Sequence, residues 1–146
     1  MWHFAKPLGI LVTAVTLGVL ATGCTPRVVP TPAPVKPVPT ASLRVSPSPA
    51  KFPSTPPPYS PMPVVKVTIT NTGTATVASI VVHPIGVYSV PSSGCGTLTP
   101  GQHCFANVQF CPTSPNHYLA TLAVTGKNTA SGAPVRASAT LDGTAT

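Results

Sequence analysis

Acidic residues are almost absent from this chain. Its 146 residues include a single acid, Asp142, against 8 Lys and Arg, which gives a formal net charge of +7. Reactions that need a pair of carboxylates are therefore excluded, because there is no second carboxylate. The basic residues are scattered singly and are not interleaved with aromatic residues, so we expect no binding to nucleic acid.

Helical periodicity is also missing beyond the first 24 residues, whereas proline is abundant. Most of the 21 prolines lie between residues 25 and 63. Proline fixes φ and lacks a backbone donor, so neither a helix nor a central strand is expected in this segment. We interpret residues 24–63 as an extended linker in the polyproline II conformation, which leaves residues 64–146 to form the folded domain.

The first 24 residues resemble the export signal of a bacterial lipoprotein. Lys6 precedes an apolar run over residues 8–20, which suits a signal peptide and is too short to span a bilayer. Small residues and then Cys24 follow this run, as in a lipobox. The resemblance implies that residues 1–23 are removed and that Cys24 carries acyl chains such as palmitate, which hold the protein to a membrane. The alternative is an ordinary signal peptide with an incidental cysteine.

The residue after the lipobox cysteine bears on localisation. Thr25, and not Asp, follows Cys24. By resemblance to the usual sorting rule of bacteria with two membranes, this implies that the exported protein is anchored at the outer membrane.

Residues 64–146 alternate apolar and polar side chains over short segments, and Gly, Pro and Asn separate these segments. The pattern predicts an all-β fold, a single antiparallel β-sandwich of about seven strands. We expect a short strand at residues 87–90, a loop at residues 126–134, and the following inward-facing residues on the other strands: Val65, Val67 and Ile69; Ala78, Ile80 and Val82; Cys104, Ala106, Val108 and Phe110; Tyr118, Ala120, Leu122 and Val124; Val135, Ala137, Ala139 and Leu141.

Cys95 and Cys104 flank a Pro100-Gly101 pair that suits a type II turn. Because exported proteins fold in an oxidising compartment, we expect a disulfide between these two cysteines. Such a bond contributes about 2–4 kcal/mol, a large share of the stability of a small domain. The alternative is two separate reduced cysteines in the core.

The same strand raises two further questions. Its alternation directs Phe105 outward, where an aromatic ring marks a contact surface. It also directs Cys111 outward and leaves this cysteine without a partner, as a free thiol or an intermolecular cross-link. A bulge before Pro112 that buries Cys111 as a small apolar residue is an alternative, and pairing with Cys95 is another.

Several motifs occur in an order that resembles a known family. They are N-T-G at residues 71–73, G-V-Y-S-V at 86–90, C-G-T-L-T-P-G-Q-H-C at 95–104, V-Q-F-C-P at 108–112, and L-D-G-T-A at 141–145. Together they resemble the immunoglobulin-like domain of bacterial choice-of-anchor D proteins and of the ASPM/SPD-2/Hydin group. The resemblance covers residues 64–145 and implies a seven-stranded sandwich used for attachment and scaffolding, without enzymatic activity. Cys111 departs from the family pattern.

The residues provide no catalytic group, cofactor site or metal site by their spacing. His83, His103 and His117, with Cys104 and Cys111, match no known rhythm of metal ligands. We therefore expect a membrane-anchored lipoprotein that presents an immunoglobulin-like binding or scaffolding domain to envelope proteins, as part of an assembly such as a secretion or conjugation system. A surface adhesin or carbohydrate-binding module is the alternative, and a periplasmic metal or redox carrier is the least favoured.

Overall fold

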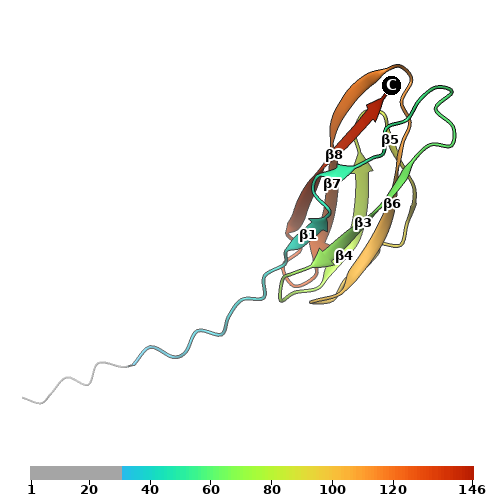
Figure 1. Cartoon of the computed structure of the whole chain (residues 1–146). Helices are drawn as coiled ribbons and strands as arrows, with labels where there is room; N and C mark the ends of the chain where they lie inside the picture. The colour runs from blue at the N-terminus through green and yellow to red at the C-terminus, as the bar shows by residue number, and fades with distance from the viewer. Residues whose placement is uncertain (1–30) are drawn as a thin grey trace, which may run out of the picture. The chain divides into compact units, whose positions relative to one another are not determined.

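The computed structural model describes residues 31–146, of which Lys36–Thr146 form one compact unit. Eight strands of this unit make two four-stranded sheets, with the orders β1-β3-β6-β5 and β2-β8-β7-β4 (Figure 1). The strands are β1 (Leu43–Ser46), β2 (Ala50–Lys51), β3 (Val64–Asn71), β4 (Val77–Pro84), β5 (Tyr88–Ser93), β6 (His103–Phe110), β7 (Asn116–Asn128) and β8 (Pro134–Ala145). Within residues 31–146, no helix is long and apolar enough to cross a membrane.

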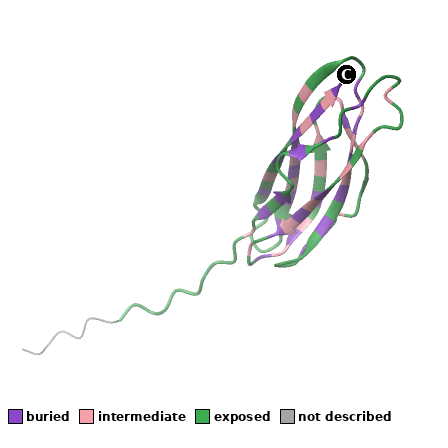
Figure 2. Cartoon of the chain, viewed as in Figure 1, coloured by how far each residue is buried: buried purple, intermediate pink, exposed green. Residues whose placement is uncertain are grey.

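The two sheets form a sandwich whose core receives side chains from both. Buried and exposed residues alternate along the strands, as the colours of Figure 2 show. This confirms the all-β sandwich. It has eight strands where about seven were expected, and all pairings are antiparallel except that of β2, which runs parallel to β8.

The alternation predicted for β6 is confirmed. Cys104 is 6% exposed, and Ala106, Val108 and Phe110 are fully buried. The residues between them are exposed or half-buried. Because side chains on a strand point to opposite faces in turn, this parity also fixes which residues of β6 reach the outer surface of the first sheet.

The expected linker was too long, because residues 43–46 and 50–51 form β1 and β2 within the sandwich. Leu43 and Val45 are buried and alternate with polar residues in a stretch free of proline. Both strands lie at sheet edges, where nearby prolines remove no hydrogen bond from a ladder. Phe52 follows them into the core, 7% exposed. The folded domain therefore begins near residue 40 and not at residue 64.

The parity expected for β4 was wrong at its first half. The register against β7 shifts between Ala78 and Val81, and Ser79 has a φ of 53°. This is a β-bulge, which adds one residue to one strand and reverses the faces beyond it. Val77 and Ile80 are consequently both buried, whereas Ala78 and Val82 are only half-buried.

Three strands extend further than the turn residues indicated. β5 continues past Pro91 to Ser93, because β5 is an edge strand and its register against β6 shifts between Ser89 and Ser92. β7 and β8 leave only residues 129–133 between them. Gly126, where the loop was expected to begin, lies inside β7. Close packing requires glycine at this position, since a Cβ there would come within 2.6 Å of the Val77 side chain on β4.

An aromatic cluster fills one end of the core. The Phe52, Tyr88 and Phe110 rings have centroids 5.2–5.8 Å apart, and Tyr118 contacts Phe110 edge-on at 5.7 Å. The Tyr88 hydroxyl donates a hydrogen bond of 2.8 Å to the carbonyl of Tyr118. Burial, and to a smaller extent the negative charge of Asp142, raises the pKa of Tyr88 to about 12.

The loop of residues 94–102 joins the two sheets. Cys95 and Cys104 form the expected disulfide. Beyond it the chain crosses to β4, where Leu98 and Val77 exchange two backbone hydrogen bonds of 2.8 and 2.9 Å. The chain then returns to β6 through the expected type II turn at Pro100-Gly101. In this turn Gln102 N–H donates to the Thr99 carbonyl, and Gly101 has a φ of 79°.

Asn71 holds this loop from the other side. Its side chain is fully buried, and its amide donates to the carbonyls of Ala75 and Leu98 at 2.8 and 2.9 Å. Its side-chain oxygen accepts from Gly73 N–H at 3.0 Å, and its backbone exchanges hydrogen bonds with Gln102 and Gly101. One carboxamide thus ties the end of β3, the turn after it and the loop together.

Replacing both Cys95 and Cys104 with Ser should lower the free energy of unfolding by about 2–3 kcal/mol, because the bond closes a short loop. Urea unfolding followed by circular dichroism measures this change. Cys111→Ser is the control for loss of a sulfur and should have a smaller effect. Unchanged midpoints in the double variant would contradict a stabilising role for the bond.

Tyr88→Phe should cost about 1 kcal/mol at neutral pH through loss of the hydrogen bond to Tyr118. The folded-state pKa of about 12 lies above the ordinary tyrosine pKa of 10.0, so the unfolded chain loses its proton first. The stability contributed by this group is complete below pH 10.0 and is lost as pH rises toward 12. Unfolding midpoints of both proteins across this interval should converge, whereas a constant difference would refute the assignment.

Candidate functional site

The outer surface of the first sheet carries basic, aromatic and amide side chains from four strands. We call it the basic face and define it by Arg44, Lys66, Ser92, His103, Phe105 and Asn107. These side chains are exposed, except that of Asn107, which is half-buried.

Strand register places these residues in rows across the sheet. Arg44 pairs with Thr70, and Thr70 pairs with His103. Four residues further along β3, Lys66 pairs with Asn107, which in turn pairs with Ser92. Directly opposed residues on neighbouring strands share a face, so each row presents its side chains to the same solvent surface.

Phe105 lies between these two rows and points outward, as its parity predicted. Its side chain is 45% exposed. The Lys66 Nζ sits 5.1 Å from the centroid of its ring, and the His103 ring contacts it edge-on at 5.2 Å. A cation–π contact and an edge contact therefore fix the ring in place while part of it stays open to solvent.

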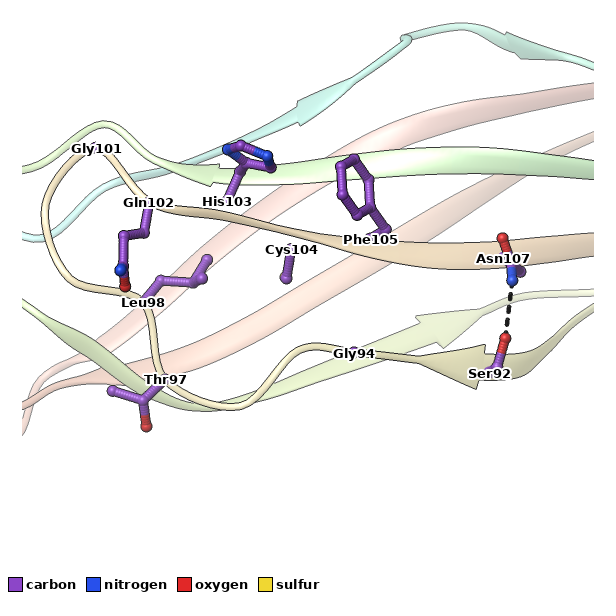
Figure 3. Close-up of a pocket in the computed structure, with 10 residues that line it drawn as sticks. All are labelled: Ser92, Gly94, Thr97, Leu98, Gly101, Gln102, His103, Cys104, Phe105 and Asn107. Atoms are coloured by element: carbon purple, nitrogen blue, oxygen red, sulfur yellow. Dashed lines mark hydrogen bonds between the residues drawn. The ribbon is translucent and has the colours of Figure 1, made fainter.

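A groove of about 720 Å³ adjoins the ring, between β6 and the loop of residues 94–102. Figure 3 shows His103, Phe105 and Asn107 along β6, with Thr97 across the gap on the loop. At one end Asn107 Nδ2 donates a hydrogen bond of 2.9 Å to Ser92 Oγ. The lining is mixed, with hydroxyl and amide groups beside the aromatic ring.

Negative charge is absent from this face. Asp142, the one acid of the sequence, lies on β8 in the other sheet. Its carboxylate lies 2.7 Å from His117 Nε2, which is the one contact between an acidic and a basic side chain within residues 31–146. Lys66 and Arg44 therefore have no carboxylate partner within residues 31–146.

Cys111 is a free cysteine that follows directly after β6. It is half-buried, so it is neither fully outward nor enclosed in the core. Its Sγ lies 3.6 Å from Ser89 Oγ, and its backbone N–H donates to the Val87 carbonyl. Pairing with Cys95 does not occur, because Cys95 is bonded to Cys104. Cys24 lies outside the described residues.

The histidines do not converge on a metal site in the described part of the chain. His83 lies on β4, His103 on β6 and His117 on β7. Across residues 31–146, no three His, Cys, Asp or Glu side chains are grouped closely enough to hold a metal ion. The hypothesis of a metal or redox carrier thus gains no support from this region.

A second surface, which the sequence did not indicate, is the outer edge of β4. This strand ends the second sheet, and the 94–102 loop pairs only with its first half, at Val77 and Ile80. Beyond the bulge, Val81 is 45% exposed and Ile85 is 58% exposed. An alternation of Val and Ile indicated a strand here, but nothing in it showed that the strand would be an edge.

The two packed four-stranded sheets, with the strand orders given above, form an immunoglobulin-like β-sandwich. The chain resembles the ASH/PapD-like domain 7 of human CEP192 with a TM-score of 0.58 and 14% identity, covering 82% of this chain and 95% of that domain. It resembles the VesB protease of Vibrio cholerae with a TM-score of 0.57 and 18% identity over 70% of this chain.

These likenesses show the fold alone, given their low sequence identity. The chain spans 32% of the length of VesB, so the activity of that protease is not transferred. No protein-family model matches the sequence, and no curated protein matches it. The function must therefore be argued from the surfaces just described.

Proposed function

We propose that this chain is an exported, lipid-anchored protein whose immunoglobulin-like domain binds a protein of the cell envelope. The observation that carries the binding role is the half-open edge of β4. An edge strand offers unpaired backbone N–H and C=O groups, to which an extended segment of another protein can add as a further strand.

The free half of this edge is apolar as well as unpaired. Val81 is exposed on it and Ile85 directly after it, and Leu119, which lies on β7 three residues beyond the Pro84–Leu122 pair, is 65% exposed. In a partner complex these side chains would be removed from water, which adds a hydrophobic contribution to the backbone hydrogen bonds. The other edge strands offer less, because β1 and β2 are short and Pro91 lies inside β5, whereas the proline of β4 is its last residue, Pro84.

Export and anchoring are supported by two independent features. The lipobox-like sequence that ends at Cys24 follows an apolar run of signal-peptide length. The disulfide between Cys95 and Cys104 belongs to proteins that fold in an oxidising compartment. With Thr25 after the cysteine, we place the anchor at the outer membrane.

The segment between the anchor and the sandwich suits a role in a multi-protein envelope assembly, such as a secretion or conjugation system. Residues 31–40 are exposed and have no secondary structure, and proline recurs along them. A proline-rich segment acts as a semi-rigid spacer, which would hold the domain away from the membrane that it is anchored to. A surface adhesin remains the second candidate, and the groove of the basic face is the observation that favours it.

Cys24→Ser should move the protein from the membrane fraction to the soluble periplasmic fraction, because acyl chains supply the membrane affinity. Mass spectrometry of the N-terminal peptide should show acylated Cys24 in the wild type. Cys111→Ser is the matched control and should stay with the membrane. An unmodified cysteine at position 24 in the mature protein would refute the anchor.

Val81→Lys should abolish co-purification of an envelope partner when the anchored protein is extracted in mild detergent and captured. A lysine on an edge strand disfavours the addition of another strand. Val38→Lys, a change of the same kind at an exposed valine outside the sandwich, should leave the partner bound. Wild-type protein recovered alone, with no stoichiometric partner, would count against the proposal.

A further inference from the structure

We propose that the basic face binds an acidic oligosaccharide, a short chain of sugars that carry carboxylates. This inference goes beyond the binding of an envelope protein and does not depend on it. The basic face belongs to the first sheet and the open edge of β4 to the second, so the two surfaces can be tested separately.

The exposed ring of Phe105 supplies the apolar element of such a site. Sugar rings have one face of C–H groups, which packs on an aromatic surface while the hydroxyls stay outward. The ring is held by Lys66 and His103 and is 45% exposed, so it needs no rearrangement to accept a ligand. A pre-positioned group binds at a lower entropic cost than a mobile one.

Hydroxyl and amide groups line the groove beside the ring and could bind sugar hydroxyls. The hydrogen bond from Asn107 to Ser92 fixes both side chains at the end of the groove. The Asn107 side-chain oxygen accepts no hydrogen bond from the described residues, and Thr97 adds a hydroxyl on the opposite wall. Amides and hydroxyls both donate and accept, which matches the dual character of sugar hydroxyls.

Charge complementarity selects an acidic sugar over a neutral one. Lys66 and Arg44 are exposed cations without a carboxylate partner in residues 31–146. The row that contains Arg44 also carries His103. The one acidic side chain, Asp142, is in the other sheet and contacts His117. A carboxylate on the ligand would form charge-assisted hydrogen bonds, which are about twice as strong as neutral ones.

The spacing of the cations calls for an oligomer. Four residues of β3 separate the row of Lys66 from the row of Arg44 and His103, which corresponds to about 13 Å along the strand. One sugar carboxylate cannot contact both rows, whereas the carboxylates of two sugars that are separated by a third sugar can. Phe105 lies between the rows, so the intervening sugar would pack on its ring.

Other anionic polymers fit this face less well. A nucleic acid is held by several Lys and Arg residues along its phosphates, and this face has two. An acidic peptide that adds as a strand needs an open backbone edge, but β3 and β6 are interior strands of their sheet. Recognition on this face must therefore come from side chains, and the groove lining adds Thr97 and Gln102 to the hydroxyl and amide groups of Ser92 and Asn107.

Isothermal titration calorimetry of the full chain in mild detergent tests the proposal with matched probes. Oligogalacturonate and its methyl ester share a backbone and differ in charge, and hyaluronate oligosaccharides provide a second acidic sugar. We expect the acidic sugars to bind, binding to weaken as salt is raised, and the methyl ester to bind at least about tenfold more weakly. Equal affinity for acid and ester, or no binding to either acidic sugar, would overturn the proposal.

Two substitutions and their controls locate the site. Phe105→Ala and Lys66→Gln should each weaken the binding of oligogalacturonate by about three- to tenfold. As controls, Val38→Ala truncates an exposed apolar side chain outside the sandwich and Lys127→Gln removes an exposed charge from the second sheet, and neither should have an effect. Equal effects in site and control variants would overturn the assignment. Tighter binding of single-stranded DNA or polyglutamate than of both sugars would also overturn it.

Discussion

The buried side chain of Asn71 is the interaction on which the arrangement of both surfaces depends. Its amide and oxygen join the turn after β3 to the loop of residues 94–102, and each partner carbonyl is buried with it. Without it, the buried Ala75 carbonyl would be left without a partner at a cost of about 1–3 kcal/mol, and the Leu98 carbonyl would keep only the hydrogen bond from Val77 N–H. The loop position in turn determines two features at once, since one side walls the groove beside β6 and the other covers the first half of the β4 edge.

Alternation along a single strand predicted much of the fold and part of the site. It placed Phe110 inward and Phe105 outward, and two cysteines around a Pro-Gly turn predicted the disulfide, because these properties depend on residues close in sequence. Alternation failed at Ser79, where a bulge reverses the faces, and it did not anticipate β1, because the seven residues between Pro39 and Pro47 are too few to show a clear period. The contacts of Phe105 with Lys66 depend on register between strands, which no local pattern encodes.

The near absence of acidic residues has a different meaning once the fold is known. Spread along the sequence, eight cations indicated only a basic protein. In the sandwich, the one carboxylate is paired on the second sheet, so the first sheet presents its cations without internal neutralisation. The second sheet also carries cations, at Lys51, Lys127 and Arg136, but it carries Asp142 as well, so the two faces differ in whether an acidic side chain is present.

The hydrogen bonds around Thr40 have a mechanical consequence. Its carbonyl accepts from the N–H groups of Thr74 and Ala75 at 2.7 and 2.9 Å, and β1 then pairs with β3 over four residues. Tension applied through the N-terminal segment would reach the sandwich at this short edge strand before it reached the core. The force that the domain withstands is thus set by local detachment of β1, which precedes global unfolding. Peeling away β1 would leave Phe52 and the aromatic cluster as the next point of resistance.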